Sequence, residues 1–219
     1  MIGLETRRFG PFLIYRIRPP RDKRLANVII GLVLFGFALG LSVEASLGVN
    51  PWTVFHGGLA NHTPLTIGTA TIATGLVLLV SFPVYQEPIG LGTLLNVAVI
   101  GTVTDLTLFA IPDLESMVAR VLALIAAPIL IGLASGLYIG AGLGPGPRDG
   151  IMTALERRNL PVWFARTLIE VTALSVGWLL GGNVGFGTLW MAGSVGFWVH
   201  VFLHRLRIDH APAPVGERR

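Results

Sequence analysis

The stretch LGPGPRD, residues 143–149, follows a long apolar run and combines residue types that suit the binding of an anion. Glycine is favoured just past a helix end, and proline is favoured at the first position of a new helix. A helix that starts at Pro147 presents free amides and the positive end of its dipole, and Arg148 adds a planar, permanently charged donor group. We therefore predict a binding corner for an anionic solute, formed by Gly144, Gly146, Pro147, Arg148 and Asp149. The alternative is a tight interfacial turn in which Arg148 and Asp149 are a solvated pair.

Further ionisable side chains lie within apolar segments, where charges are costly and usually face the protein interior. Glu44 has no nearby cation in the sequence, so it either pairs across the bundle or takes up a proton. Arg166 and Glu170 are one helical turn apart, so they form either a helix-stabilising pair or a part of the site. Together with Asn50, these residues complete the predicted solute site, and the secondary candidates are Asp105 and His200.

The elements that carry these residues are apolar segments long enough to cross a membrane. Of 219 residues, 53% are hydrophobic and 13% are charged, whereas about 25% are charged in an ordinary soluble domain. The stretches without charged residues have room for spans of roughly 20 apolar residues each. We predict an all-α membrane protein with six transmembrane helices, at about 26–46, 66–83, 90–111, 118–142, 163–181 and 186–205.

The basic residues predict the orientation of these spans. With the N-terminus in the cytoplasm, all but Arg120 of the 16 Lys and Arg residues fall in cytoplasmic segments. This bias follows the positive-inside rule. We therefore expect both termini in the cytoplasm, with a basic N-terminal tail at 1–25 and a C-terminal tail at 206–219. Because the basic residues lie beside spans, we expect no nucleic-acid partner.

The chain contains an internal repeat. ALGLSVEASLGVNPW aligns with ASGLYIGAGLGPGPR at its Leu-Gly and Pro positions, so that Trp52 matches Arg148, and GLGTLLNVAVIG aligns with GFGTLWMAGSVG. Two separated matches indicate a duplicated three-span unit, at 26–111 and 112–205. Because each unit has an odd number of spans, the second enters the membrane from the opposite side. We therefore predict a 3+3 inverted repeat with a short broken-helix segment after the first helix of each unit, an arrangement typical of transporters.

Several kinds of chemistry lack their residues. There is no cysteine, and His56 and His62 have no carboxylate companions at ligand spacing, so we expect no metal site. The motifs GxxxxGK[ST], GxSxG and HExxH do not occur, so we expect no cofactor and no enzyme. One alternative is an intramembrane enzyme that acts on a phosphorylated lipid through Arg148 and Asp149.

The motifs resemble a family of bacterial inner-membrane proteins, the YczE-type branch of the YczE/YyaS/YitT family. The resemblance covers residues 28–203 and is carried by LGVNPWTVFHGGLANHTPLTIGTA, GLGTLLN, LGPGPRDGIMTALERR, RTLIEV and GWLLGGNVGFGT. It implies a multi-span protein of the bacterial cytoplasmic membrane with a role in transport. Some YczE-type genes are associated with MocR-like regulators that sense pyridoxal phosphate, which implies vitamin B6-related or amino-acid-like solutes. The resemblance supplies no catalytic residues.

We therefore expect a small inner-membrane transporter or solute-binding membrane subunit for a small anionic, amino-acid-like or B6-like solute. The alternative is a non-catalytic accessory or scaffold subunit that binds another membrane protein or lipid. The expected partners are the lipid bilayer, the solute, and a partner membrane subunit or a second copy of the chain. The basic tails suit contact with anionic lipid headgroups.

Overall fold

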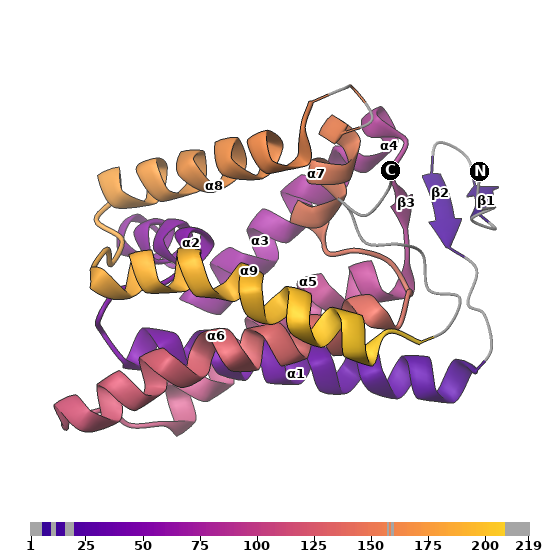
Figure 1. Cartoon of the computed structure of the whole chain (residues 1–219). Helices are drawn as coiled ribbons and strands as arrows, with labels where there is room; N and C mark the ends of the chain where they lie inside the picture. The colour runs from indigo at the N-terminus through magenta and orange to yellow at the C-terminus, as the bar shows by residue number, and fades with distance from the viewer. Residues whose placement is uncertain (1–5, 10–11, 16–19, 157, 159, 209–219) are drawn as a thin grey trace.

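The protein is a bundle of α-helices with a small sheet at one end (Figure 1). The computed structural model describes residues 6–9, 12–15, 20–156, 158 and 160–208. The long helices are α1 (Arg21–Glu44), α5 (Leu91–Ala110), α6 (Met117–Gly140), α8 (Val162–Leu179) and α9 (Phe186–Leu206). The shorter elements are α2 (Pro51–His62), α3 (Ile67–Val80), α4 (Phe82–Tyr85), α7 (Pro147–Glu156), β1 (Thr6–Phe9), β2 (Phe12–Tyr15) and β3 (Pro88–Ile89).

The described helices lie where the apolar segments predicted them. α1, α3, α5, α6, α8 and α9 match the six predicted segments, and α2 and α7 are the short helices that follow the two breaks. In the described part of the chain, four helices, α1, α5, α6 and α9, are long and apolar enough to cross a membrane. A fifth span results if α2 and α3, which are bent by 110° at their break, are counted as one. The chain is thus a membrane protein with four or five candidate spans, and six spans remain a prediction.

The shortness of α3 explains why it does not qualify alone. It has 14 residues, which corresponds to about 21 Å at 1.5 Å per residue. The hydrocarbon core of a bilayer is about 30 Å thick. By length and composition, α3 counts as a candidate span only together with α2, from which it is bent by 110°.

Both predicted helix breaks are present with the expected local chemistry. Gly48 and Gly144 have φ of +104° and +116°, a region that glycine enters at little cost. Pro51 and Pro147 are the first residues of α2 and α7, where the missing amide hydrogen leaves no partner unsatisfied. The repeated Leu-Gly and Pro signals therefore end one helix and start the next.

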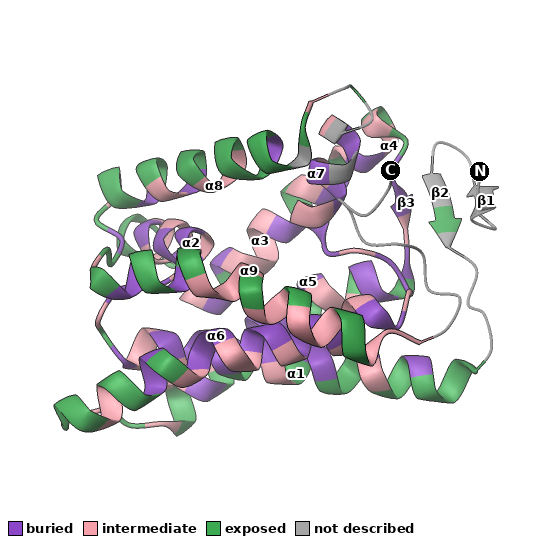
Figure 2. Ribbon diagram, viewed as in Figure 1, coloured by how far each residue is buried: buried purple, intermediate pink, exposed green. Residues whose placement is uncertain are grey.

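The packing of the helices follows the repeat. α1 and α6, the first helices of the two units, pack along each other, with α5 against α1 and α9 against α6. α2 packs on α8 and α3 packs on α7, so each short helix contacts the other unit. α2 and α7 lie toward opposite ends of the bundle (Figure 1). The buried residues concentrate along α1 and α6 (Figure 2), where Gly31 lies against the carbonyl of Ala134 and lets the two helices approach closely.

Two contacts between glycines join the units, and we call them glycine crossings. In the first glycine crossing, Gly48 lies against Gly185 at the start of α9. In the second glycine crossing, Gly144 lies against Gly90 at the start of α5. The amide of Gly187 donates to the carbonyl oxygen of Leu47 at 2.7 Å. The corresponding bond, from the amide of Gly92 to the oxygen of Leu143, is 2.8 Å long. Each break is therefore held by the last helix of the other unit, and the two crossings have equivalent contacts.

The two units differ in how the last two of their predicted spans pack. α3 packs along α5, whereas α8 and α9, the equivalent pair, are held apart (Figure 1). A β-carbon added at Gly101 of α5 would collide with the backbone of Gly68 in α3, but one added at Gly196, the equivalent position of α9, would meet nothing within 4 Å. The bundle is thus closed between α3 and α5 and open between α8 and α9.

A three-stranded sheet lies beside the bundle, and the sequence analysis did not predict it. β1 pairs antiparallel with β2, and β2 pairs in parallel with β3. The segment 1–25, interpreted as a tail, therefore contributes two strands, and α1 already begins at Arg21. Within the predicted C-terminal tail, α9 ends at Leu206 and residues 209–219 lie outside the described residues.

Candidate functional site

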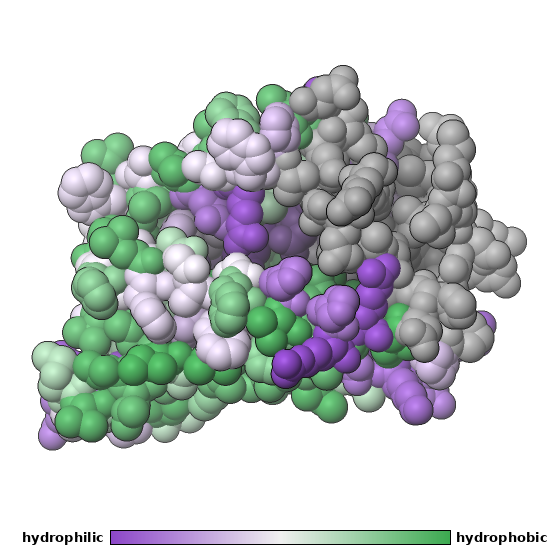
Figure 3. Space-filling view, in the orientation of Figure 1, coloured by the Kyte–Doolittle hydropathy of each residue, from purple (hydrophilic) through white to green (hydrophobic). Residues whose placement is uncertain are grey.

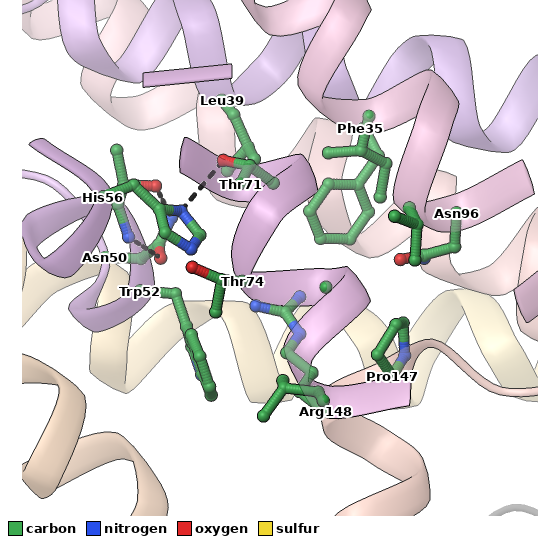
Figure 4. A pocket seen from close by; sticks show the side chains of 15 residues that line it. Phe35, Leu39, Asn50, Trp52, His56, Thr71, Thr74, Asn96, Pro147 and Arg148 are labelled. Carbon is green, nitrogen blue, oxygen red and sulfur yellow. Dashed lines mark hydrogen bonds between the residues drawn. The ribbon is translucent and has the colours of Figure 1, made fainter. Parts of the chain in front are cut away.

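A first cavity of about 60 Å³ lies inside the first unit, where α1, α2, α3 and α5 meet the start of α7. Its apolar wall includes Phe35, Leu39 and Ile100. Its polar wall consists of Asn50, Trp52, Thr53, His56, Thr71, Thr74, Asn96 and Arg148 (Figure 4). A small apolar pocket with a few convergent polar groups is the usual form of a solute site.

Several of these polar side chains have unused hydrogen-bonding capacity. His56 is 5% exposed, and its Nε2 has no hydrogen-bond partner among the described residues. The indole nitrogen of Trp52 is likewise buried and unpartnered. Native proteins pair nearly all buried polar atoms, so each unpaired one indicates a ligand, a water molecule or strain. Two such atoms belong to residues that line one cavity, which makes this cavity the candidate site.

Arg148 is the charged group of the first cavity. Its guanidinium lies 5.4 Å from the centre of the Phe35 ring, a cation–π contact. Among the described residues it makes no hydrogen bond and has no carboxylate within 4 Å. Figure 4 shows the guanidinium directed into the space between Trp52 and Thr74. A permanent cation without a counter-ion, facing a cavity, suits an anionic ligand.

The starts of α2 and α7, which are equivalent in the repeat, are built differently. Asn50 caps α2, because its side-chain oxygen accepts from the Thr53 amide at 3.1 Å. The equivalent position before α7 is Gly146, which has no side chain to serve as a cap. Asn96 lies beside Gly146, so close that a β-carbon added there would be 3.1 Å from its amide nitrogen. The Asp149 carboxylate in the first turn of α7 is nearly as close, 3.2 Å from such a β-carbon, and offsets the positive end of the helix dipole. The amide of Asn96 is therefore the neutral donor beside Arg148 at this end of the cavity.

A second cavity of about 100 Å³ lies in the other unit, between α6, α7, α8 and α9. Its charged residues are Arg148, Asp149, Arg166 and Glu170. Both carboxylates already have partners: Glu170 accepts from Arg166 Nε at 2.9 Å, and Asp149 accepts from the Tyr138 hydroxyl at 2.9 Å. Hydrophilic residues are visible in a hollow between α8 and α9 (Figure 3). The second cavity therefore lies on the open side of the bundle.

The two cavities are related by the sequence repeat. Phe35, His56, Asn96 and Ile100 line the first cavity, and their repeat equivalents Ile131, Met152, Met191 and Val195 line the second. Trp52 and Arg148, which are equivalent to each other, line both cavities. The pair therefore lies between the two cavities, near the centre of the molecule. The chemistry differs because the polar His56 and Asn96 are replaced by methionines in the second unit.

The predicted site residues do not all meet. Asn50, Pro147, Arg148, Asp149, Arg166 and Glu170 line one cavity or both, and Gly144 and Gly146 form the break before α7. Glu44 lines neither cavity; it ends α1, where its carboxyl group interacts with that of Asp113. His200 is exposed on α9 and also lines neither cavity.

Asp105 has a structural environment at the start of α3. Its carboxylate accepts from the Gly68 amide at 2.8 Å and from the Thr66 hydroxyl, and both donors belong to the first turn of that helix or its cap. A carboxylate at a helix N-terminus stabilises the helix through hydrogen bonds and the dipole. Asp105 thus ties α5 to α3 on the closed side of the bundle.

We expect Asp105→Ala to lower the free energy of unfolding by about 1–3 kcal/mol, since it leaves the buried Gly68 amide without an acceptor. The affinity for solute should stay unchanged, because Asp105 lines neither cavity. Thermal unfolding of the purified protein in detergent measures the first effect, and ligand titration measures the second. If Asp105→Ala kept full stability and weakened solute binding, Asp105 would be a binding residue rather than a structural one.

Sequence reasoning did not select Trp52, His56, Thr74 and Asn96 as binding residues. Trp52 was available as the repeat equivalent of Arg148, and His56 follows it by one helical turn, which places both on one face of α2. Thr74 and Asn96 lie on other helices, and their convergence depends on how α3 and α5 pack. As to metals, no group of three His, Cys, Asp or Glu residues within the described ranges is placed to hold an ion.

Comparison with known proteins agrees with the resemblance. The family of unknown function DUF6198 matches residues 23–204. An uncharacterized protein of Haemophilus influenzae is 32% identical over 192 residues, which cover 87% of this chain and 88% of that protein. The uncharacterized membrane protein YczE of Bacillus subtilis is 34% identical over 162 residues, 73% of this chain and 75% of that protein. The uncharacterized protein YyaS of the same organism is 27% identical over 182 residues, 80% and 89% of the two chains. No solved structure matches the chain at a significant level.

The family match runs from the first turn of α1 to the last turn of α9. It therefore includes both helix breaks, both glycine crossings and the residues that line both cavities. The predicted relation to YczE and YyaS is confirmed by the two Bacillus subtilis proteins. The chain is a membrane protein that belongs to the family of unknown function DUF6198.

Proposed function

We propose that the protein binds a small anionic solute between its two units and carries it across the bacterial inner membrane. The observation that supports this most directly is Arg148, a permanent cation that borders both cavities and has no carboxylate within ion-pair distance among the described residues. Arg148 is half-buried, and its planar guanidinium offers the donor fork that suits a carboxylate or phosphate group. A bound anion would give this cation the counter-charge that it lacks among the described residues.

The transport part of the proposal rests on the relation between the units. In an inverted repeat with both termini in the cytoplasm, the two equivalent cavities face opposite sides of the membrane, with the solute site between them. Trp52 and Arg148 border both cavities, so a solute held by Arg148 is within reach of either one. The second cavity lies between α8 and α9, which lack the packing contact that α3 and α5 make beside the first cavity.

The test is a binding and flux experiment on the purified full chain. Its melting temperature is measured in detergent and chloride-free buffer against inorganic phosphate, acetate, lactate, glutamate and pyridoxal phosphate. A ligand that binds only the folded state at a hundred times its Kd stabilises it by about 2.7 kcal/mol. We expect a saturable increase for at least one anion, and uptake of that anion by proteoliposomes that contain the protein.

Two results would contradict the proposal. A sample that melts cooperatively and responds to none of the anions has no anion site, which favours the accessory-subunit alternative. If an anion binds but never enters the proteoliposomes, the protein is a solute-binding subunit that does not transport by itself. Neutral solutes of the same size, such as propanol and acetamide, are the matched controls and should not raise the melting temperature.

A further inference from the structure

The first cavity contains an acceptor that faces the same space as the donors. His56 Nδ1 and the Thr71 hydroxyl oxygen are 2.9 Å apart. The single hydrogen of that hydroxyl is directed to the carbonyl oxygen of Ile67 at 2.8 Å. Nδ1–H is therefore the donor to Thr71, and in the neutral ring the lone pair is on Nε2. Since Nε2 is buried and unpartnered among the described residues, it is an acceptor that awaits a donor.

Two of the other polar groups of the cavity are donors only. The guanidinium of Arg148 and the indole N–H of Trp52 donate only, and the amide of Asn96 both donates and accepts. No carboxylate lines the first cavity among the described residues. A carboxylate on the solute therefore matches Arg148 and Trp52, whereas an ammonium group finds no counter-charge there. The group that meets His56 Nε2 is thus a neutral donor.

Size limits the solute further. The cavity of about 60 Å³ has room for a few water-sized groups at about 10–15 Å³ each, which favours a small solute. A carboxylate and a donor on neighbouring carbon atoms fit within such a space. The apolar remainder of the solute would lie against Phe35, Leu39 and Ile100.

We infer that the solute of this site is a small hydroxycarboxylate, whose carboxylate binds Arg148 and Trp52 and whose hydroxyl group donates to His56 Nε2. This inference rests on the proposed function, since it names the substrate class of the same site. His56 is then the residue that sets specificity: it distinguishes a hydroxy acid from the plain acid of the same length. A site built to pair a substrate hydroxyl rejects the analogue that lacks it, because its own polar atom stays unpaired.

The test uses three acids that differ only at the second carbon: lactate, propionate and alanine, which carry a hydroxyl group, a hydrogen and an ammonium group. Isothermal titration of the purified full chain in chloride-free buffer gives their Kd values. We expect lactate to bind at least tenfold more tightly than either of the others. Equal affinity for lactate and propionate, or tighter binding of alanine, would overturn the inference while the anion site remains.

The His56→Phe variant tests the residue itself. It keeps a flat ring and removes both nitrogens, and the Thr71 hydroxyl retains its bond to Ile67. We expect lactate affinity to fall at least tenfold, to the level of propionate, and propionate affinity to change less than twofold. An undiminished preference for lactate would assign the hydroxyl group to another residue. If this variant does not fold, the comparison of the three acids on the wild-type chain still decides.

The failure of the substrate class and the failure of the site are distinguishable. Binding of phosphate or pyridoxal phosphate without binding of lactate overturns the hydroxycarboxylate and keeps the proposed anion site. Absence of binding by every anion overturns both.

Discussion

Replacing Arg148 by methionine is expected to weaken anion binding by about a hundredfold without lowering the melting temperature of the ligand-free protein. The loss follows from removing one partner of a shielded charge pair, which costs about 2–5 kcal/mol. The stability is retained because the wild-type guanidinium has no carboxylate partner within reach among the described residues, and methionine keeps the apolar stem beside Phe35. When a side chain contributes to ligand binding and not to the fold, its removal does not lower the stability of the ligand-free protein.

The conservative variant refines the same prediction. Arg148→Lys keeps the charge and loses the planar fork that holds a carboxylate with two parallel bonds. We expect about a tenfold increase in Kd, in line with the roughly 1.5–3 kcal/mol of a hydrogen bond to a charged group. Isothermal titration with the anion that binds best to the wild-type chain measures both variants, and thermal unfolding measures their stability.

Arg120 is the matched control for these substitutions. Its Nε donates to the carbonyl oxygen of Leu114 at 2.6 Å, and it lines neither cavity. Arg120→Met should therefore lower the melting temperature and leave the Kd unchanged, the reverse of the Arg148 result. If Arg148→Met lowered the melting temperature and left binding intact, Arg148 would be a structural residue and the proposed function would lose its main support.

Gly90→Ala is expected to destabilise the protein by about 3 kcal/mol, near the top of the usual range for overpacking. The φ of Gly90 is −109°, which any residue adopts, so the effect comes from contact alone. A β-carbon at this position would collide with the carbonyl oxygen of Leu143. Because that oxygen is backbone and accepts the amide of Gly92 at 2.8 Å, it cannot move aside without loss of the bond that joins the two units.

The control for this prediction is the same substitution at an open site. Gly193 lies within α9, and an added β-carbon meets nothing within 4 Å. Gly193→Ala should stabilise the protein by about 0.5–1 kcal/mol, the difference in helix propensity. Thermal unfolding in one detergent compares the two variants. Equal melting temperatures for Gly90→Ala and the wild type would show that the second glycine crossing does not contribute to the stability of the fold.

Local signals in the sequence predicted most of the architecture. Runs of apolar residues predicted the six helical segments, because a helix in the membrane requires a continuous apolar surface and few other parts of the chain are apolar enough to supply one. The repeated Leu-Gly and Pro signals placed the two breaks, since glycine and proline act on the backbone within one or two residues of their own position. Arg148 could be selected for the same reason, because it directly follows the Leu-Gly and Pro signal of the second break.

Other features depended on residues far apart in the chain. The first cavity brings together Trp52 of α2, Thr74 of α3, Asn96 of α5 and Arg148 of α7, and each is unremarkable within its own segment. The sequence equally could not place Glu44 beside Asp113 rather than beside Arg148. An aligned repeat assigns equivalent positions to the two units, but equivalence does not say how closely the helices pack.

The sequence by itself thus determined that this chain is a membrane protein with apolar helices and a helix break at each of its two Leu-Gly and Pro signals. Composition, periodicity and backbone preference are properties of short segments, so they can be read without the fold. Only the tertiary structure decided that each break is held by the other unit and that α8 stands away from α9. It also decided that His56, whose Nε2 has no partner among the described residues, lines the same cavity as Arg148. These features arise from close packing between distant helices, where the size of one glycine or the direction of one lone pair determines which groups meet.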